Sequence, residues 1–490
     1  MRTPELDCHK VLERAVAFLQ AEAQPCYLVG GYVRDRLLEA PARDLDVAVA
    51  GDAVALARRL ADATGGAFYV LDEATEAARI VYRPRPDGFV VDVAAMRGPD
   101  IVADLRDRDL TINAMAIGID HCLSPNPPII DPCAGRQDLV EQTVRATGDQ
   151  AFLRDPVRML RALRFSATLG FRIDRQTEAW IRRDADNLAS TSAERKRDEF
   201  AHVVAASSAA DHLRRMEELG LLRHVLPEVT ILKGVPQAPP HIHDVYEHTL
   251  AAVAQAERLV AGSEPRLTPD ERRFLLPYAE ELAAHFGRVE TEGRLRSSWL
   301  KLCALLHDVA KPMALQDKES GVRRAARHAE VGAEMAAQAL RRLRFSAREI
   351  RLACKVIAHH MRPGLMLKSG PLNLRGVYRF FRDTGDAGID VIVLALADQL
   401  ATRGPTLEKE HWRDYLALAG QLLEHYFHKP GEAVSPPVLI NGRDVLSVLR
   451  VRPGPLVGQA LEEVREAQAE GLVRSREEAL DFVRGVRRRS

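Results

Sequence analysis

The sequence predicts an α+β protein, in which a head that mixes strands and helices is followed by a chain that is almost wholly helical. Up to about residue 150, short apolar runs typical of strands alternate with segments of helical periodicity. From Phe152 onward, apolar residues recur with the helical period almost throughout. At roughly 150 residues per domain, a chain of 490 residues has room for about three domains.

The elements of the head can be predicted one after another. Residues 9–22 have helical periodicity, and the strand Cys26–Val29 leads through Gly30 and Gly31 into a second helix. The remaining predictions for the head are strands at Leu45–Val49, 67–71, 78–82 and Val90–Ala94, with a helix over 54–64.

Proline-rich breaks divide the helical part of the chain. They fall at Gly234–Pro240 and Pro430–Pro437, where prolines interrupt the helical pattern. We therefore predict four parts, namely the head at 1–150, a helical neck and body at 151–235, a helical domain at 241–430 and a helical tail at 431–490.

Composition and charge exclude several classes of protein. The chain has 69 Lys and Arg against 69 Asp and Glu, which excludes a histone-like polycation but allows a local basic groove. The strongest apolar run, Val391–Ala397, is too short to span a bilayer, and the first ten residues lack the apolar core of a signal peptide. The six cysteines are scattered, which argues against a disulfide scaffold or a Cys-based zinc site. We therefore expect a cytoplasmic protein that does not bind membranes.

Two glycines follow the first predicted strand, at a place where a phosphate can bind. Gly30 and Gly31 allow backbone N–H groups to approach a phosphate, and the N-terminus of the following helix adds positive potential. Arg34 lies one helical turn further on and can reach the same anion. By itself, a pair of glycines is more often an ordinary turn, so this alternative stays open.

The segment Arg43–Val49 places two carboxylates on one face of a predicted strand. Side chains alternate along a strand, so Asp44 and Asp46 point the same way. Two such carboxylates repel each other unless a cation lies between them. Mg²⁺ prefers a few carboxylates together with substrate phosphates, and a pair of ions can activate a hydroxyl and stabilise a pyrophosphate leaving group. Asp92 is either a third carboxylate of this site or a solvent-facing strand residue.

Four motifs of the head and neck form a combination that is highly specific. They are GGYVRD at 30–35, RDLDVAV at 43–49, LRDRDLTINA at 105–114 and FLRDPVRMLRALRF at 152–165. In order and spacing, they resemble the class II tRNA nucleotidyltransferase and bacterial poly(A) polymerase family over about residues 24–230. The resemblance implies a polymerase-β-like head, a helical neck and body, and transfer of CMP or AMP from CTP or ATP to the 3′ end of an RNA such as tRNA.

The resemblance also implies roles for individual residues. Asp44 and Asp46 are the catalytic ligands of Mg²⁺. The residues implied to bind the nucleotide are Gly30, Gly31, Arg34, Arg108, Asp109, Asp155, Arg158 and Arg161. Two positions depart from the family, because Asp107 stands where an Arg is usual and Arg154 stands where a Glu is usual. Residues 194–199 fit an E-R-x-x-x-E pattern that stabilises the neck helix in relatives.

Asp155 and Arg158 offer a physical basis for selecting C and A. They are three residues apart, so they are expected to share a helix face. A carboxylate accepts from the amino group and a guanidinium donates to the ring nitrogen of cytosine or adenine. Guanine and uracil present the opposite order and would leave both groups unpaired. The alternative is an ordinary surface salt bridge.

The third predicted domain contains a further set of histidines and aspartates. His307-Asp308 ends an apolar helical run, and the order of the surrounding residues resembles the HD phosphohydrolase superfamily. The metal ligands that this resemblance implies are His248, His307, Asp308 and Asp398, with His328 and His359, or its neighbour His360, able to hold a second ion. Imidazole and carboxylate suit a transition metal such as Ni²⁺, Co²⁺ or Mn²⁺, which would activate water against a phosphoester. The alternative is a degenerate domain with core histidines.

The interval Met96–Asp107 bears on how many nucleotides are added. CCA-adding relatives usually carry a long flexible loop there, and relatives that add only CC share a shortened one. The interval is short here, so we predict addition of CC, with the terminal A left to a separate A-adding enzyme. Two other functions stay open: a poly(A) polymerase, and an HD hydrolase or regulator whose head only binds RNA. The intact Asp44 and Asp46 argue against the regulator.

Overall fold

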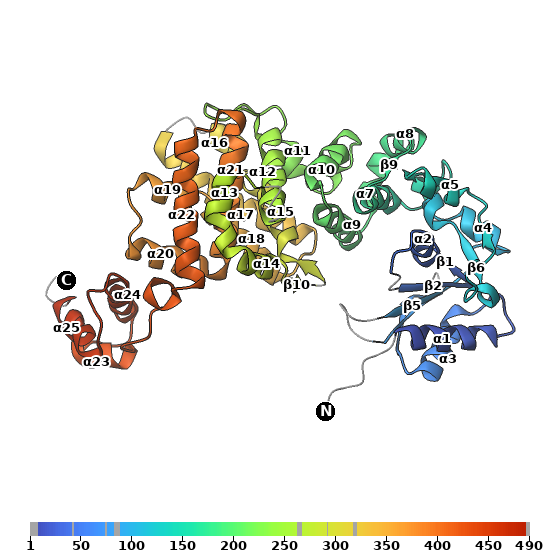
Figure 1. Ribbon diagram of the computed structural model, residues 1–490, viewed down its shortest axis with the longest axis horizontal. Helices are drawn as coiled ribbons and strands as arrows, with labels where there is room; N and C mark the ends of the chain where they lie inside the picture. Colours follow the sequence, from blue (N-terminus) through green and yellow to red (C-terminus); the bar gives the residue numbers. More distant parts are fainter. Residues whose placement is uncertain are drawn as a thin grey trace. The chain divides into compact units, whose positions relative to one another are not determined.

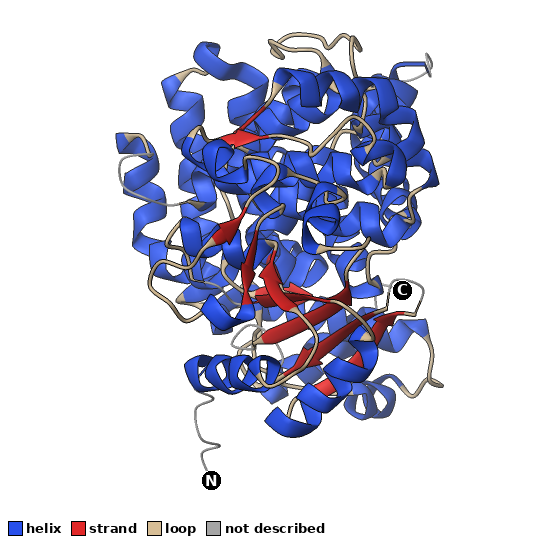
Figure 2. Ribbon diagram, turned by 90° about the vertical axis from the view of Figure 1, so that its right-hand side faces the viewer, coloured by secondary structure: helices blue, strands red, loops and turns tan. Residues whose placement is uncertain are grey.

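The computed structural model describes residues 8–41, 44–73, 76–82, 89–261, 267–291, 293–316 and 321–486. The chain forms two compact units, one of residues 1–206 and 215–224 and the other of residues 207–214 and 225–490. A mixed sheet lies in the first unit, and helices make up most of the rest (Figure 2). The predicted α+β class is therefore confirmed.

The first unit is built on a seven-stranded sheet in the order β3-β4-β5-β2-β1-β6-β7. Figure 1 labels β1, β2, β5 and β6 of this sheet. Its strands are β1 (Cys26–Val29), β2 (Asp44–Val49), β3 (Ala67–Asp72), β4 (Ala77–Val81), β5 (Val90–Ala95), β6 (Ala116–Gly118) and β7 (Ile129–Ile130). Strands β2 and β5 run parallel, whereas the other neighbours are antiparallel. The parallel register places Asp46 beside Asp92.

Strand β2 separates the core from a polar surface by simple alternation. Leu45 and Val47 are buried, whereas Asp44 and Asp46 are partly exposed. The helices α1 (Cys8–Gln20) and α3 (Ala53–Thr64) pack against each other, and α3 covers β3, β4 and β5. These strands and helices agree with the predicted ranges except at their ends.

The rest of the first unit is mainly helical. Its helices are α2 (Gly31–Leu37), α4 (Ile101–Arg106), α5 (Gly135–Val140), α6 (Ala151–Arg154), α7 (Val157–Leu169), α8 (Arg175–Asp184) and α9 (Ala193–Ala205). Two short parallel strands, β8 (Thr143–Val144) and β9 (Arg172–Ile173), join the segments before and after α7. Helix α7 packs along α9, and α10 (Ala209–Glu218) is shared by the two units.

The second unit contains a helical body and a hairpin. Its elements up to residue 427 are α11 (Pro227–Thr230), α12 (Val245–Val260), α13 (Pro269–Leu275), α14 (Ala279–Phe286), β10 (Val289–Thr291), β11 (Arg294–Leu295), α15 (Arg296–Leu306), α16 (Lys311–Gln316), α17 (Gly321–Arg342), α18 (Ala347–His359), α19 (Arg362–Lys368), α20 (Leu374–Thr384), α21 (Gly388–Arg403) and α22 (Lys409–Phe427). Helix α12 packs against both α15 and α21, and α17 packs against α18.

Three helices form the tail of the second unit. They are α23 (Gly442–Leu449), α24 (Pro455–Ala469) and α25 (Arg476–Val486), which enclose a small apolar core of their own. Helix α24 contacts α20 through Glu466, whose carboxylate accepts hydrogen bonds from Arg375 and Arg379. None of the described helices combines the length and apolar character needed to cross a membrane.

Candidate active site and candidate metal centre

One cavity of about 830 Å³ in the first unit collects all the catalytic and nucleotide-binding residues predicted for the head and neck. The predicted residues that line it are Gly30, Gly31, Arg34, Asp44, Asp46, Arg108, Asp109, Asp155, Arg158 and Arg161. They come from Gly30 and helix α2, from strand β2, from the residues that follow α4, and from Asp155 and helix α7. Residues far apart in the sequence therefore form a single wall of carboxylates and guanidinium groups.

Asp46, on β2, lies against the turn that joins β1 to α2. The backbone N–H of Gly31 donates to Asp46 Oδ2 at 3.1 Å. Gly30 has a φ of 65°, and a Cβ added there would lie 2.9 Å from Asp46 Oδ2, so both backbone conformation and space require glycine. Burial raises the pKa of Asp46, and Asp92 raises it further. A divalent cation would relieve this repulsion, so Asp44 and Asp46 fit the Mg²⁺ predicted for them.

Asp92 lines the same cavity, on the neighbouring strand. Its two carboxylate oxygens accept from Nε and Nη2 of Arg79, both at 2.8 Å. Asp92 is therefore more than a solvent-facing strand residue, although a guanidinium already occupies both of its oxygens.

Two arginines of the cavity are held by residues that the sequence did not single out. Arg34 Nη1 donates to Asn113 Oδ1 at 2.7 Å, and its guanidinium lies 4.8 Å from the centre of the Phe165 ring. Arg108 donates through Nε and Nη2 to Asp104 Oδ2 at 3.0 and 2.9 Å. The i, i+4 spacing of Asp104 and Arg108 is a signal from which this pair could have been predicted.

Asp109 and Arg161 form a buried ion pair at the cavity wall. Arg161 Nε donates to Asp109 Oδ2 at 2.6 Å, and the N–H of Leu110 donates to Oδ1 at 2.8 Å. Burial alone would raise the pKa of Asp109, but Arg161 holds it well below its usual range. From α9, Glu199 approaches Arg164 at 3.1 Å and Arg161 at 3.6 Å. These contacts join α9 to α7.

The expectation that Asp155 and Arg158 share a helix face is wrong. Asp155 has an extended conformation (φ −149°, ψ 99°) between α6 and α7. It precedes Pro156, whose ring disfavours the helical conformation of the residue before it. Arg195 donates to both oxygens of Asp155, with Nη1–Oδ1 at 3.0 Å and Nη2–Oδ2 at 2.6 Å. Asp155 and Arg158 nevertheless line one cavity.

The two positions that depart from the family motifs contact each other. Arg154, the last residue of α6, forms an ion pair with Asp107, which caps the C-terminus of α4. Arg97 Nη1 lies 3.6 Å from Asp107 Oδ2. A positive and a negative residue therefore face each other at these two positions.

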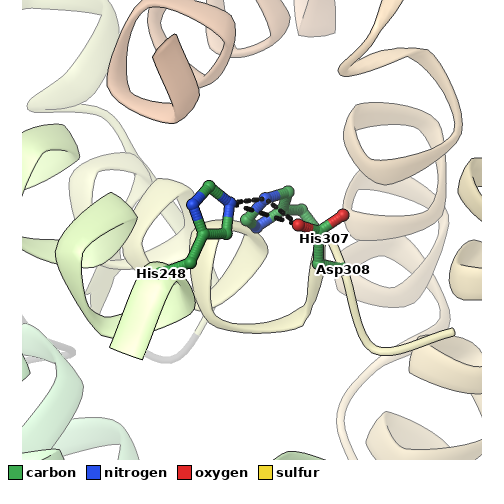
Figure 3. A group of neighbouring side chains, drawn as sticks. All are labelled: His248, His307 and Asp308. Carbon is green, nitrogen blue, oxygen red and sulfur yellow. Dashed lines mark hydrogen bonds and ion pairs between the residues drawn. The ribbon is translucent and has the colours of Figure 1, made fainter. Parts of the chain in front are cut away.

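A second cluster of polar side chains lies inside the second unit (Figure 3). Nε2 of His248, on α12, is 3.3 Å from Nε2 of His307, which follows α15. Asp308 Oδ2 lies 3.2 and 3.1 Å from these two nitrogens, and Asp398 Oδ1, on α21, lies 3.1 Å from the His248 nitrogen. The four residues implied as primary ligands therefore meet at one point.

The hydrogen bonds of the imidazoles favour metal binding. His307 Nδ1 is 2.7 Å from the carbonyl of Ala304, and His360 Nδ1 is 2.7 Å from that of Ile357. A carbonyl only accepts, so Nδ1 carries a hydrogen and Nε2 is the atom that faces the cluster, where it can bind a metal once it has lost its proton. The buried His248 Nδ1 has no hydrogen-bond partner within the described part of the chain. Neutral imidazoles with carboxylates fit a divalent transition metal.

Asp308 also belongs to a second group of ligand atoms, together with His328 and His360. The ring of His360 is buried and lies 5.1 Å from that of His307 and 5.6 Å from that of His328. His359 is therefore the wrong choice for this position. Successive residues of a helix point about 100° apart, so only one of two neighbouring histidines can face the cluster.

Lys311 and His241 border the cluster and were not predicted. Lys311 Nζ lies 2.5 Å from Asp308 Oδ2, donates to Gln237 Oε1 at 2.6 Å and lies 3.3 Å from His241 Nε2. Burial opposes protonation of His307, but Asp308 raises its pKa to about 10. Burial would raise the pKa of Asp308, yet His307 and Lys311 hold it well below its usual range. Positive charge on His307 and Lys311 therefore lies directly beside the negative charge of the Asp308 carboxylate.

Three stretches of the chain match known families. Residues 26–145 match the poly(A) polymerase head domain, residues 170–232 match a probable RNA- and SrmB-binding site of polymerase A, and residues 245–403 match the HD domain. The fold is that of CCA-adding enzymes. An apo form has a TM-score of 0.62 at 20% identity, covering 98% of this chain and 94% of that one. The Thermotoga maritima CCA-adding enzyme complexed with tRNA-CCA has a TM-score of 0.60 at 21% identity, covering 99% and 97%.

These matches define the class of protein, in which a polymerase-type head is joined to an HD domain. Relatives of nearly equal length show the family. The A-adding tRNA nucleotidyltransferase of Deinococcus radiodurans is 33% identical, covering 93% of this chain and 94% of the relative. The CC-adding tRNA nucleotidyltransferase of Thermus thermophilus is 31% identical, covering 93% and 92%. The chain belongs to the tRNA nucleotidyltransferase family, and the resemblance seen in its motifs is confirmed.

Proposed function

We propose that the first unit adds nucleotides from CTP, or from CTP and ATP, to the 3′ end of tRNA without a nucleic-acid template. The observation that carries this proposal is the single cavity that contains both the Asp44–Asp46 pair and the Asp155–Arg158 pair. The relatives are named tRNA nucleotidyltransferases, and solved structures with this fold include complexes with CTP, ATP and tRNA-CCA.

Each group of residues has a distinct part in this reaction. Asp44 and Asp46 would hold Mg²⁺, which when bound activates the terminal hydroxyl and stabilises the departing pyrophosphate. Arg34 and Arg108 supply positive charge for the triphosphate, because both guanidinium groups are fixed at the cavity. Asp155 accepts from the amino group of the base, and a guanidinium completes the pair.

We propose further that the head adds CC and not the terminal A. Strand β5 ends at Ala95, and α4 begins at Ile101 with Asp100 as its N-cap. Asp100 Oδ1 accepts from the N–H of Ala103 at 2.9 Å, and Ile101 and Leu105 are buried. The interval between strand and motif is thus a short turn and a packed helix, with little chain that can remodel the pocket.

Acceptors that differ only at the 3′ end test this proposal. The chain should add CMP from CTP to tRNA that lacks CCA, in the presence of Mg²⁺. It should add AMP only weakly to tRNA that ends in CC. Addition of A as fast as addition of C would overturn the CC assignment. A-addition alone is the second candidate, favoured by the 33% identity to an A-adding relative.

The same assay separates the more distant alternatives. Long poly(A) products on unrelated RNA would instead support a poly(A) polymerase. An absence of any incorporation, with RNA still bound, would support a regulator whose head only binds RNA.

We propose a second activity, hydrolysis of phosphoesters by the second unit. Its support is the convergence of His248, His307, Asp308 and Asp398, with His328 and His360 alongside. These side chains would hold a transition metal ion, which when bound activates water. Model esters and cyclic nucleotides should be hydrolysed with Ni²⁺, Co²⁺ or Mn²⁺, and His307→Ala should abolish this while leaving CMP addition intact. Equal, undetectable hydrolysis in both proteins would indicate a degenerate domain.

A further inference from the structure

Two ion pairs hold the segment Arg154-Asp155, one at a residue that lines the cavity and one at a residue that does not. Asp155 lines the cavity and is bound through both oxygens by Arg195. Its neighbour Arg154 does not line the cavity and pairs with Asp107. Asp155, which is proposed to recognise the base, is therefore adjacent in sequence to Arg154, which has an ion-pair partner of its own.

Asp107 occupies the equivalent place in the other motif. It directly precedes Arg108 and Asp109, which both line the cavity, whereas Asp107 itself does not. The Arg154–Asp107 pair thus links two cavity-lining segments that are 47 residues apart in the sequence. Arg161, on α7, also joins these parts of the chain through its ion pair with Asp109 at the cavity wall, whereas Arg154 and Asp107 join them through residues that do not line the cavity.

Exposure indicates that this pair contributes little to stability. The side chain of Arg154 is 56% exposed and that of Asp107 is 25% exposed. Ion pairs that are open to solvent contribute little to stability. The geometry of a reactive site is far more sensitive, because a displacement of about 1 Å can cost about 100-fold in rate.

We propose that the Arg154–Asp107 ion pair determines nucleotide specificity by fixing Asp155 relative to Arg108 and Asp109. Both members are positioning residues, since neither lines the cavity. The pair fixes the position of the Asp155 carboxylate, which binds the base, relative to Arg108 and Asp109, which bind the sugar and the phosphates. This inference rests on the function proposed above for the first unit.

A double-mutant cycle on the full chain tests the proposal. Arg154→Ala and Asp107→Asn should each lower the preference for CTP over UTP by about tenfold, mainly through a higher KM for CTP. Arg154→Ala removes the pair with Asp107, and Asp107→Asn removes this pair together with the contact to Arg97, so the double variant should be no worse than Asp107→Asn alone. Arg154→Lys keeps the positive charge and should retain most of the preference.

A matched control is available in the same unit. Arg223 pairs with Asp186 at 2.6 Å, both side chains are exposed, and neither residue lines the cavity. Arg223→Ala should leave the preference unchanged. Additive effects of the two variants, or a preference unchanged in both, would overturn the proposal.

A binding measurement separates this proposal from the function on which it rests. The ratio of dissociation constants for CTP and UTP is measured without tRNA, by calorimetry. If the parent chain adds nothing to tRNA, the function fails, yet a loss of the binding ratio in Arg154→Ala still supports the ion pair. A parent chain that binds CTP and UTP equally overturns the inference.

Discussion

At the scale of single residues, Asp46 is the group on which nucleotide addition should depend most. It lies beside Asp92 and accepts from the N–H of Gly31, and its position leaves no room for a side chain at Gly30. Asp46→Asn should lower CMP addition by about 100-fold or more, since even outer-shell partners of a metal ligand contribute about 10–100-fold. Asp52→Asn is the matched control, because Asp52 caps α3 outside the cavity. Near-normal incorporation by Asp46→Asn with Mg²⁺ would contradict the assignment.

Asp155 should govern the choice of base. Asp155→Ala removes the acceptor for the amino group, and it also frees Arg195 from its bidentate partner. We expect slower use of CTP and a weaker discrimination against UTP and GTP, because a hydrogen-bonding site rejects mismatched groups strongly. Competition between labelled triphosphates measures this ratio. Asp186→Ala, at an exposed aspartate of the same unit, should leave it unchanged.

His307 should make the stability of the metal-free protein depend on pH. Burial opposes its protonation, but Asp308 raises its pKa from 6.5 to about 10. Protonated His307 therefore stabilises the fold fully below pH 6.5, and this contribution is lost as the pH rises through about 10. With a chelator present, Tm should fall more steeply over this range in the parent chain than in His307→Gln.

Excess Ni²⁺ or Mn²⁺ should remove that difference, because a bound metal replaces the proton on the imidazole. Parallel pH profiles for the chelated parent and variant would show that His307 carries no such charge.

Single residues also show where prediction from sequence reaches its limit. The ten predicted residues that line the cavity are identifiable from the sequence because their motifs have a recognisable spacing. The sequence does not decide between His359 and His360, because the phase of a helix end is not readable from two adjacent identical residues, and His359 is the wrong one of the two. Lys311 and His241 were not predicted, since tertiary packing alone brings His241 near the cluster.

At the scale of elements, α4 is a helix that the sequence did not predict. The interval after β5 offered only one turn signal, Gly98-Pro99. The helix forms because Asp100 caps it and because Ile101 and Leu105 are buried, which are consequences of packing that a short apolar pattern does not reveal. The strands and helices before it were predicted well, since alternation and helical periodicity are local properties.

The contact between α20 and α24 should determine whether the tail stays docked. The Glu466 side chain is 8% exposed and binds Arg375 and Arg379. Glu466→Ala should cost about 1.5–3 kcal/mol, the usual contribution of a hydrogen bond to a charged group. Faster hydrogen exchange in α23–α25, with little change in α12, would report an undocked tail. Glu470→Ala, at a more exposed position, should have a smaller effect.

At the scale of the whole molecule, the two proposed activities lie in different compact units. All residues of the nucleotide cavity belong to the first unit, and all ligands of the histidine cluster belong to the second. The fold class was predictable because the change from mixed to helical pattern is visible near residue 150. The division into four parts stays a prediction, since the compact units follow contacts rather than proline breaks.

The two ion pairs around Arg154-Asp155 have a consequence for accuracy in different buffers. Arg154 and Arg195 are each more than half exposed, at 56% and 54%, so dissolved ions reach both pairs. The screening length shrinks from about 10 Å at 0.1 M salt to about 3 Å at 1 M. We expect the error frequency, UMP misincorporated per CMP, to rise with ionic strength. Taking this ratio on one tRNA cancels the general weakening of RNA binding by salt, and a constant ratio would contradict the expectation. An enzyme of this kind would copy no template, yet its fidelity would depend on the surrounding electrolyte.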